Sequence, residues 1–283
     1  MDPKKKKLIV GIVLVVILVG GFFVYRSFQY VTTDNAMIQA PTMLLSSKVS
    51  GIIVHADVQE NQKVKAGQLL AEIKPDDYQN ALAQAESERD SLTAQAKNAE
   101  TSFQRTSQLL KKGASTQERY EISQAQYLSS QSKLKAAEAQ LTQARLNLEY
   151  TKIVAPSDGK IGRRSCEVGM LASTGQPLMG FVSGNERWVV ANLKETDMAQ
   201  VSEGKKAFIK VDAVPGKEFE GTVESISPTT GATFSLLPPD NATGNFTKVV
   251  QRVPIRIKLL NLSEKEIDRL QAGLSAEVKV QVR

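Results

Sequence analysis

The sequence predicts an α+β chain of several domains in an elongated arrangement: an N-terminal transmembrane helix, a split β domain, a long antiparallel coiled-coil hairpin of α-helices and a C-terminal β-barrel. Three observations support this prediction. An uncharged apolar run lies near the N-terminus, a long stretch without proline occupies the middle, and two copies of a glycine-spaced motif flank that stretch.

Charge is concentrated at the N-terminus. The 283 residues include 36 Lys and Arg and 30 Asp and Glu, a net charge of +6. Residues 1–26 contain five basic residues and one acid, so the rest of the chain carries 31 minus 29, or +2. A nearly neutral body lacks the basic surface of a nucleic-acid binder. We therefore expect no nucleic-acid partner.

Residue types that support catalysis are scarce. The chain has one cysteine, Cys166, and one histidine, His55, which precludes an intramolecular disulfide and disfavours a His/Cys metal site or a histidine-based triad. We expect His55 to be an ordinary strand residue and Cys166 a small packed side chain. The sequence has no phosphate-binding glycine loop and no nucleophile with a base. It predicts neither an enzyme nor a bound cofactor or metal.

The segment from Leu8 to Tyr25 predicts a membrane anchor, with residues 1–26 forming the cytoplasmic tail and the span. It carries no charge, and as a helix it would rise about 27 Å against a hydrocarbon core of about 30 Å. Four lysines precede it, which places the N-terminus in the cytoplasm and the body on the other side. The alternative is a cleaved signal peptide, but the run is longer than the usual apolar region and no A-x-A-like site follows.

Residues 77–150 predict a helical hairpin, because they contain no proline and a single glycine, Gly113. Apolar and small residues recur with heptad spacing in each arm. The predicted seam includes Leu92 and Phe103 in the first arm and Tyr127, Leu134 and Leu141 in the second. Arms of about 34 residues would each be about 50 Å long. A compact bundle is the alternative, but a narrow stripe on each arm favours a two-stranded coiled coil.

The turn between the arms is predicted from Gly113, which suits a left-handed helix stop, and from Ser115 with Glu118, which fit a capping box. The chain should therefore reverse direction close to these residues.

An internal repeat flanks the hairpin. Gly51 and Gly67 are 16 residues apart, as are Gly159 and Gly175, and each copy ends in Gly-Gln-x-Leu. Half of a small β-sandwich cannot bury its apolar face alone, so the two copies should pack together and bring the feet of the hairpin side by side. We assign residues 46–76 and 151–183 to the two halves.

The repeat resembles the two halves of a biotinyl/lipoyl domain, which offers a rival function as a carrier of a covalent cofactor. Such carriers present the modified lysine on the hairpin between the halves, typically within Asp-Lys-Ala. Here that place reads Ile73-Lys74-Pro75-Asp76-Asp77-Tyr78 and leads into the long insertion. We therefore expect no attached biotin or lipoate.

Residues 184–283 predict a β-barrel domain. Alternating or β-branched runs at 188–193, 206–211, 219–226, 249–260 and 276–282 are typical of strands, and residues 197–201 suit a short helix. Residues 27–45 should hold a linker and the first barrel strand, with Ala36 to Leu45 returning to the same sheet.

This nested order resembles the HlyD-like membrane fusion proteins, and more closely the Emr-type multidrug-efflux adaptors. The most specific motifs are Thr33-Asp34-Asn35-Ala36, Val49-Ser50-Gly51, Ala155-Pro156-Ser157-Asp158-Gly159 and residues 234–255, FSLLPPDNATGNFTKVVQRVPI. The resemblance implies a periplasmic adaptor anchored in the inner membrane by a single span. It also implies two partner proteins, a major-facilitator drug pump and a TolC-like outer-membrane channel. The chain itself is implied to form a homo-oligomer, commonly a hexamer.

The resemblance further implies that the hairpin tip contacts the channel. Related adaptors carry an Arg-x-x-x-Leu-x-x-x-x-x-x-Ser pattern there. Arg105 and Leu109 match its first two places, whereas Ser115 comes one residue early and Thr116 occupies the strict spacing. An adaptor for a protein-secreting ATP-binding-cassette transporter is the alternative function, but residues 234–255 favour drug efflux.

Overall fold

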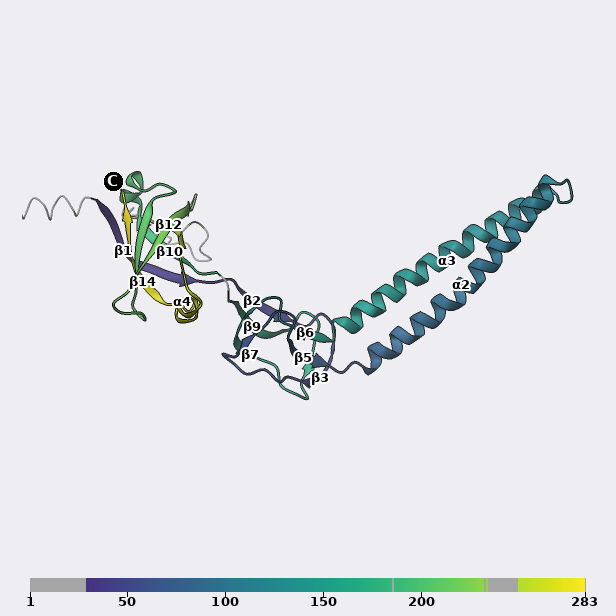
Figure 1. Ribbon diagram of the computed structural model, residues 1–283, viewed down its shortest axis with the longest axis horizontal. Helices are drawn as coiled ribbons and strands as arrows, with labels where there is room; N and C mark the ends of the chain where they lie inside the picture. The colour runs from purple at the N-terminus through teal and green to yellow at the C-terminus, as the bar shows by residue number, and fades with distance from the viewer. Residues whose placement is uncertain (1–28, 185, 232, 234–248, 283) are drawn as a thin grey trace, which may run out of the picture. The chain divides into compact units, whose positions relative to one another are not determined.

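A computed structural model describes residues 29–184, 186–231, 233 and 249–282 (Figure 1). The chain divides into two compact units, one formed by residues 1–41 and 183–283 and the other by residues 42–182. The predicted anchor, Leu8 to Tyr25, and most of the 234–255 motif lie outside the described residues. Within the described ranges, no helix combines the length and apolar character needed to cross a bilayer.

The first unit is a closed barrel of six antiparallel strands, as the sequence predicted. The strands follow the order β1-β10-β13-β12-β11-β14 around the barrel. Their bounds are β1 (Tyr30–Gln39), β10 (Trp188–Lys194), β11 (Lys206–Val211), β12 (Glu218–Ile226), β13 (Arg252–Leu259) and β14 (Ser275–Gln281). Because β1 pairs with both β10 and β14, the N-terminal strand closes a sheet built mostly from the C-terminal part of the chain. Closure leaves no exposed edge.

The barrel core follows from the alternating pattern of its strands. In β10 the buried residues Val189, Ala191 and Leu193 alternate with half-exposed neighbours. The side chains that are fully buried inside are Ile38, Val189, Ala191, Leu193, Ile209, Ile257, Leu270, Val278 and Val280. A barrel of this size is therefore filled by its own side chains.

Two short helices accompany the barrel. The predicted helix at 197–201 is a 3₁₀ helix, η1 (Glu195–Gln200). A second helix, α4 (Glu264–Arg269), was not predicted, although Ser263 and Glu266 form a capping box at its start. Leu270, which ends α4, is fully buried in the barrel core.

The predicted strand from Ala36 to Leu45 is wrong as a single element. β1 ends at Gln39, and β2 (Thr42–Ser46) belongs to a sheet of the second unit. Pro41, which separates them, has no backbone N–H for a ladder, although its carbonyl accepts a hydrogen bond from the Ser183 N–H at 2.9 Å.

The second unit contains two four-stranded sheets. One has the order β2-β9-β7-β4, with β9 (Pro177–Ser183), β7 (Gly159–Arg164) and β4 (Lys63–Val64). The other has the order β6-β5-β3-β8, with β6 (Lys152–Val154), β5 (Leu69–Ile73), β3 (Gly51–His55) and β8 (Leu171–Ala172). Each sheet mixes strands from both sides of the hairpin, so neither half forms a sheet alone.

The predicted repeat is confirmed by hydrogen bonds that recur at an offset of 108 residues. Ile53 exchanges backbone hydrogen bonds with Gly169 and Met170, and Ile161 exchanges the same pair with Asn61 and Gln62. The backbone groups of Ser47 bond to Gly175 and Gln176, and those of Ala155 bond in the same way to Gly67 and Gln68. The offset also converts the strand order of one sheet into that of the other.

The core between the sheets repeats at the same offset. Ile53 and Ile161 are both fully buried, as are Leu70 and Leu178. Cys166 occupies the place that Val58 holds in the first half, and both side chains are buried. Cys166 is thus a packing residue, as predicted.

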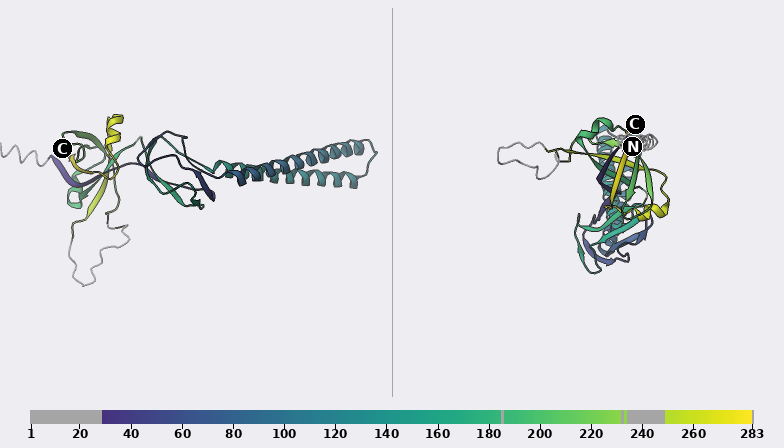
Figure 2. Two further views of the ribbon diagram at one scale, coloured as in Figure 1. Left: turned by 90° about the horizontal axis from the view of Figure 1, so that it is seen from below. Right: turned by 90° about the vertical axis from the view of Figure 1, so that its left-hand side faces the viewer.

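Two antiparallel helices, α2 (Asp76–Lys111) and α3 (Gln117–Glu149), connect β5 to β6. Figures 1 and 2 show them side by side along their length. At 36 and 33 residues they are about 54 and 50 Å long. Gly113 adopts φ +70°, as predicted for a left-handed stop.

The turn is held by local hydrogen bonds. The Ala114 N–H donates to the Leu109 carbonyl and the Gly113 N–H to the Leu110 carbonyl, which is the Schellman arrangement. The predicted capping box of Ser115 and Glu118 is wrong. Thr116 is the N-cap of α3, and its side-chain oxygen accepts from the Arg119 N–H, because the helix begins one residue later than the box requires.

The feet of the hairpin are fixed to the β2–β3 connection. The Tyr78 hydroxyl at the start of α2 donates to the Ser50 carbonyl at 2.6 Å. The Lys48 ammonium lies 4.3 Å from the ring centre of Tyr150, just after α3. One loop of the first half therefore holds both helices at their base.

We expect Gly159→Ala to destabilise the sandwich by about 2 kcal/mol, because a Cβ there would overlap the Val182 carbonyl oxygen and the Phe181 ring. Gly162→Ala is the matched control on the same strand. Its Cβ would lie 3.7 Å from the nearest atom, so the change should stay within about 0.5 kcal/mol. Urea unfolding of the purified full-length protein, followed by circular dichroism, measures both. Equal midpoints for the two variants would contradict this packing.

Candidate docking surfaces on the helical hairpin

The residues predicted to form the seam are among the less exposed positions of the two helices. Leu92, Phe103, Tyr127 and Leu134 are partly buried, and Leu141 is buried. Several small residues are also buried on the facing sides of the helices: Ala85 and Ala96 on α2 and Ser130 and Ala137 on α3. Small side chains at these places allow the two backbones to approach closely.

Toward the turn, the seam contains a cluster of aromatic residues. The Phe103 ring on α2 is stacked on Tyr127 of α3, with ring centres 5.4 Å apart and planes inclined by 4°. Phe103 also lies 5.4 Å from the ring of Tyr120 in a tilted arrangement. This aromatic cluster joins the two arms near the end that carries the turn, where the chain is remote from the sheets that hold its feet.

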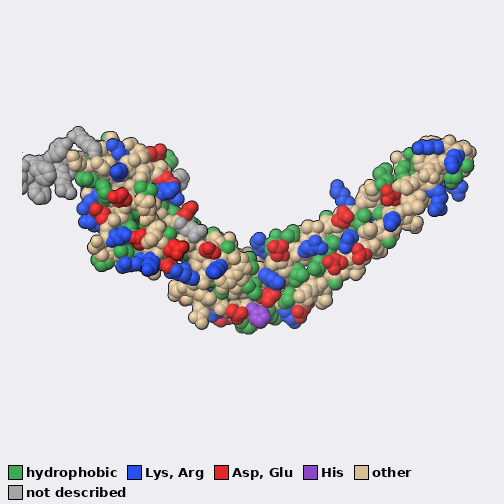
Figure 3. Space-filling model, in the orientation of Figure 1, with side chains coloured by type: hydrophobic (Ala, Val, Ile, Leu, Met, Phe, Trp, Pro, Cys, Tyr) green, Lys and Arg blue, Asp and Glu red, His purple; other side chains and the backbone are tan. Residues whose placement is uncertain are grey.

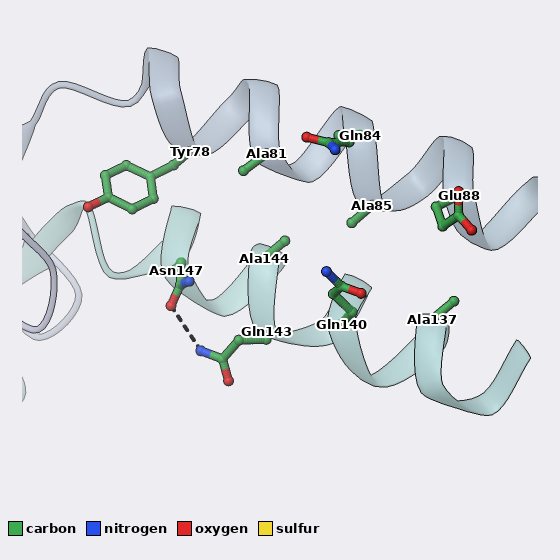
Figure 4. Close-up of a pocket in the computed structure, with 10 residues that line it drawn as sticks. All are labelled: Tyr78, Ala81, Gln84, Ala85, Glu88, Ala137, Gln140, Gln143, Ala144 and Asn147. Carbon is green, nitrogen blue, oxygen red and sulfur yellow. Dashed lines mark hydrogen bonds between the residues drawn. The ribbon is translucent and has the colours of Figure 1, made fainter. Parts of the chain in front are cut away.

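Toward the feet, the small seam residues leave a groove between the helices (Figure 4). The groove encloses about 460 Å³. It is lined by Tyr78, Ala81, Gln84, Ala85 and Glu88 from α2 and by Ala137, Gln140, Gln143, Ala144 and Asn147 from α3. Gln143 donates to the Asn147 side-chain oxygen at 2.9 Å.

The chemistry of this groove is that of hydrogen bonding and not of catalysis. Amide side chains and alanines dominate the lining, and Glu88 and Tyr78 are its ionisable groups. The lining offers no nucleophile with a base beside it. In the described ranges, no three His, Cys, Asp or Glu side chains gather in a way that could hold a metal ion.

Cys166 is likewise unsuited to catalysis. Its side chain is fully buried in the sandwich core. Burial raises the pKa of the Cys166 thiol, and the nearby positive charge of Arg164 offsets this only in part. The side chain therefore stays a neutral thiol at physiological pH.

The turn end of the hairpin presents the predicted contact residues in different ways. Arg105 and Leu109 are exposed and lie one helical turn apart on α2, so they share a face. Thr116 is exposed but uses its side chain as the N-cap of α3, and Ser115 beside it is partly buried. The geometry thus leaves Arg105 and Leu109 available to a partner.

Two further exposed apolar residues near this end were missed in the sequence. Ile122 and Leu128, both on α3, are more than half exposed. The sequence did indicate their exposure, because each is a large apolar residue that falls outside the heptad seam of α3.

Basic side chains surround the turn. Lys111, Lys112 and Arg119 are all exposed, and on the face drawn in Figure 3 basic side chains gather at this end of the hairpin. With Arg105 they outnumber the neighbouring acids Glu118 and Glu121. The turn end therefore combines exposed apolar residues with a positive charge, as expected of a surface that meets another macromolecule.

Comparison with known families agrees with this architecture. The barrel-sandwich hybrid domain of RND-type membrane fusion proteins matches residues 42–183, and the YknX-like β-barrel domain matches residues 188–280. These two matches correspond to the two units of the structure.

Individual relatives extend over nearly the whole chain. The colistin resistance protein EmrA of Acinetobacter baumannii is 36% identical, with 99% of this chain and 96% of that protein covered. The multidrug export protein EmrA of Haemophilus influenzae is 32% identical, covering 99% of this chain and 84% of that protein. Among solved structures, the membrane fusion protein Spr0693 of Streptococcus pneumoniae shares the fold, with a TM-score of 0.65 at 17% identity over 90% of this chain and 99% of that one. The chain belongs to the membrane fusion protein family.

Proposed function

We propose that this chain is the periplasmic adaptor of a tripartite multidrug efflux system. The observation that carries the proposal is the 36% identity to a colistin resistance protein over nearly the full length of both chains. The similarity to the multidrug export protein of Haemophilus influenzae also supports drugs as the exported cargo. Membership of this family makes the chain a structural linker and not an enzyme.

The inner-membrane partner in this proposal is a major-facilitator drug pump. Support comes from the Emr-type motifs, above all residues 234–255. The anchor from Leu8 to Tyr25 would hold the adaptor in the inner membrane beside that pump, with its body in the periplasm.

The outer-membrane partner is a TolC-like channel that meets the turn end of the hairpin. The exposure of Arg105 and Leu109 supports this contact, as does the excess of basic residues at the turn. Ser115 and Thr116 would lie at the margin of the contact, since Thr116 is already engaged as a helix cap. A homo-oligomer, commonly a hexamer in this family, would present several such tips to one channel.

Deletion of the gene from its own host tests the function. The deletion strain should become more sensitive to several chemically unrelated toxic compounds, and the intact gene supplied in trans should restore resistance. Sensitivity that stays unchanged across a broad panel of compounds, colistin included, would refute the efflux role.

The anchor predicts where the protein is found. A reporter enzyme active only outside the cytoplasm, fused after Arg283, should be active, and the protein should sediment with the inner membrane, because the uncharged run follows four lysines. Cell fractionation and reporter activity measure this. Release of the whole body by osmotic shock without detergent would rule out a retained anchor.

Leu109→Asp should reduce channel binding while leaving the hairpin folded. Leu109 is 41% exposed, so the change places a charge in the docking surface and not in the seam. Loss of such an anchor typically costs about 2 kcal/mol, roughly a thirtyfold loss of affinity. Drug resistance and cross-linking to the channel report the loss, and circular dichroism of the purified protein reports the fold.

Two variants control this experiment. Ala83→Asp places the same charge on an exposed position of α2 near the feet and should leave resistance unchanged. Leu134→Asp alters the seam and should lower helical content or melting temperature along with export. If Leu109→Asp keeps wild-type resistance and cross-linking, the turn end is not the docking surface.

A further inference from the structure

The groove near the feet of the hairpin has the size of a small-molecule site (Figure 4). Its volume of about 460 Å³ lies within the range of about 300–1,000 Å³ that is typical of ligand pockets. The lining on α2 runs from Tyr78 to Glu88, a rise of about 15 Å along the helix axis. The groove is therefore long enough for an elongated molecule of drug size.

Alanine side chains from both helices form the apolar part of the groove. Ala81 and Ala85 line it on α2, and Ala137 and Ala144 line it on α3. Because an alanine side chain ends at Cβ, these positions leave open a space that longer side chains would fill. Their methyl groups can contact the hydrocarbon body of a ligand, but they do not select its charge. That selection depends on the polar groups of the lining.

The lining carries one charged side chain, and that side chain is acidic. Glu88 supplies a carboxylate, and no residue of the lining is basic. The arginines on either side of this region have acidic partners of their own: Arg89 pairs with Asp90 at 3.0 Å, and Arg145 pairs with Glu86 at 4.0 Å. The charge of the groove therefore favours a cation over an anion.

The polar side chains of the lining have unused hydrogen-bonding capacity. At the start of α3, Gln117 donates to the Glu121 carboxylate one helical turn away, at 2.9 Å. Gln84 and Glu88 have the same spacing, yet within the part of the chain that the structure describes neither side chain has a hydrogen bond or an ion pair. The same holds for Gln140 on the facing helix. A carboxylate and two amides are thus available to a ligand.

An aromatic ring lies at the end of the groove opposite to the carboxylate. This ring belongs to Tyr78, whose hydroxyl donates to the Ser50 carbonyl at 2.6 Å, so its position is fixed by the sandwich. Aromatic rings stack on planar groups and attract cations to their faces. With Glu88 at one end and Tyr78 at the other, the groove suits a molecule that combines positive charge with an aromatic or apolar body.

We propose that this groove binds small, elongated organic cations. The cationic group pairs with Glu88, the amides of Gln84 and Gln140 hydrogen-bond to polar substituents, and the body of the ligand lies along the alanines toward Tyr78. The inference deepens the proposed function and rests on it for its meaning, because it identifies organic cations as the class of cargo that the adaptor itself contacts. Binding involves no covalent step, so the cargo leaves the groove unaltered.

Fluorescence anisotropy with two dyes tests the proposal on the purified full-length protein in a non-ionic detergent. Rhodamine 6G is a cation and fluorescein is an anion, and both are built on the same three-ring xanthene frame, so the pair isolates the effect of charge. Rhodamine 6G should bind saturably, and fluorescein should bind at least about tenfold more weakly. Absence of saturable rhodamine 6G binding, or equal binding of the two dyes, would overturn the proposal.

Two acid-to-amide variants locate the site. Glu88→Gln removes the charge of the lining and should weaken rhodamine 6G binding about fivefold, as expected for the loss of one solvated ion pair. Glu86→Gln is the matched control on the same helix, because Glu86 does not line the groove, and it should bind the dye as the wild type does. Equal losses in the two variants would show attraction to negative charge in general and refute the site.

A second pair of variants tests whether the dye occupies the groove. Ala144→Leu fills part of the space and should weaken rhodamine 6G binding at least about tenfold. Ala83→Leu adds the same side chain at an exposed position outside the lining and should leave binding unchanged. Circular dichroism reports the fold of both, and wild-type binding by folded Ala144→Leu would refute the proposal. If Ala144→Leu lowered the melting temperature, Glu88→Gln would decide, because it keeps the size of an exposed side chain.

The failure of this proposal is distinguishable from the failure of the efflux role. If deletion of the gene left drug sensitivity unchanged while rhodamine 6G bound through Glu88, the efflux role would fail and the binding site would stand. If Glu88→Gln bound the dye as tightly as the wild type, the binding site would fail and the efflux role would stand.

Discussion

The pairing of two incomplete halves is the constraint on which the rest of this unit depends. Each sheet of the sandwich takes strands from both sides of the hairpin, and the backbone groups of Ile53 and Ile161 close equivalent hydrogen bonds with the opposite half. Neither half can bury Leu70 or Leu178 without the other, because a few short strands alone are unstable in water. Residues more than a hundred positions apart must therefore meet before this core exists, and the intervening helices have to form a structure whose two ends lie together.

An antiparallel hairpin satisfies that requirement. The residue types between its two helices differ from the feet to the turn. Near the feet, where Tyr78 and Tyr150 fasten the helices to the β2–β3 connection, the buried residues are two alanines, Ala85 and Ala137, and Leu141. Toward the turn, where the sheets no longer restrain the helices, stacking of Phe103 on Tyr127 supplies a larger contact. Exposed side chains at the turn can then vary without weakening the helix pair, because the contacts that hold the two helices together lie between them.

Much of this fold could be predicted because it is recorded in periodic patterns. The glycine spacing identified the repeat, and the alternating runs identified five barrel strands. Features fixed by a single residue or by tertiary contact were harder to predict. Thr116 is the N-cap of α3, although the sequence favoured Ser115 for that position. Pro41 separates two strands, in different units, that the sequence suggested as one. Helix α4 was not predicted, although Ser263 and Glu266 cap it. The exposed apolar pair of Ile52 and Leu171 had no sequence signal of its own, because only the register of β3 against β8 brings the two residues together.

The repeat also allows the side chains on the outer faces of the sandwich to be compared with those in its core. Inside the sandwich, equivalent positions hold similar residues, such as Ile53 and Ile161 or Val58 and Cys166, because both halves fill one core. Outside, Ile52 corresponds to Lys160 and Leu44 to Lys152, so each face has apolar residues where the other has lysine. The hydrogen-bonded frame is therefore nearly symmetric while the side chains on its two outer faces differ, because the backbone bonds fix the strands and make no demand on the exposed side chains.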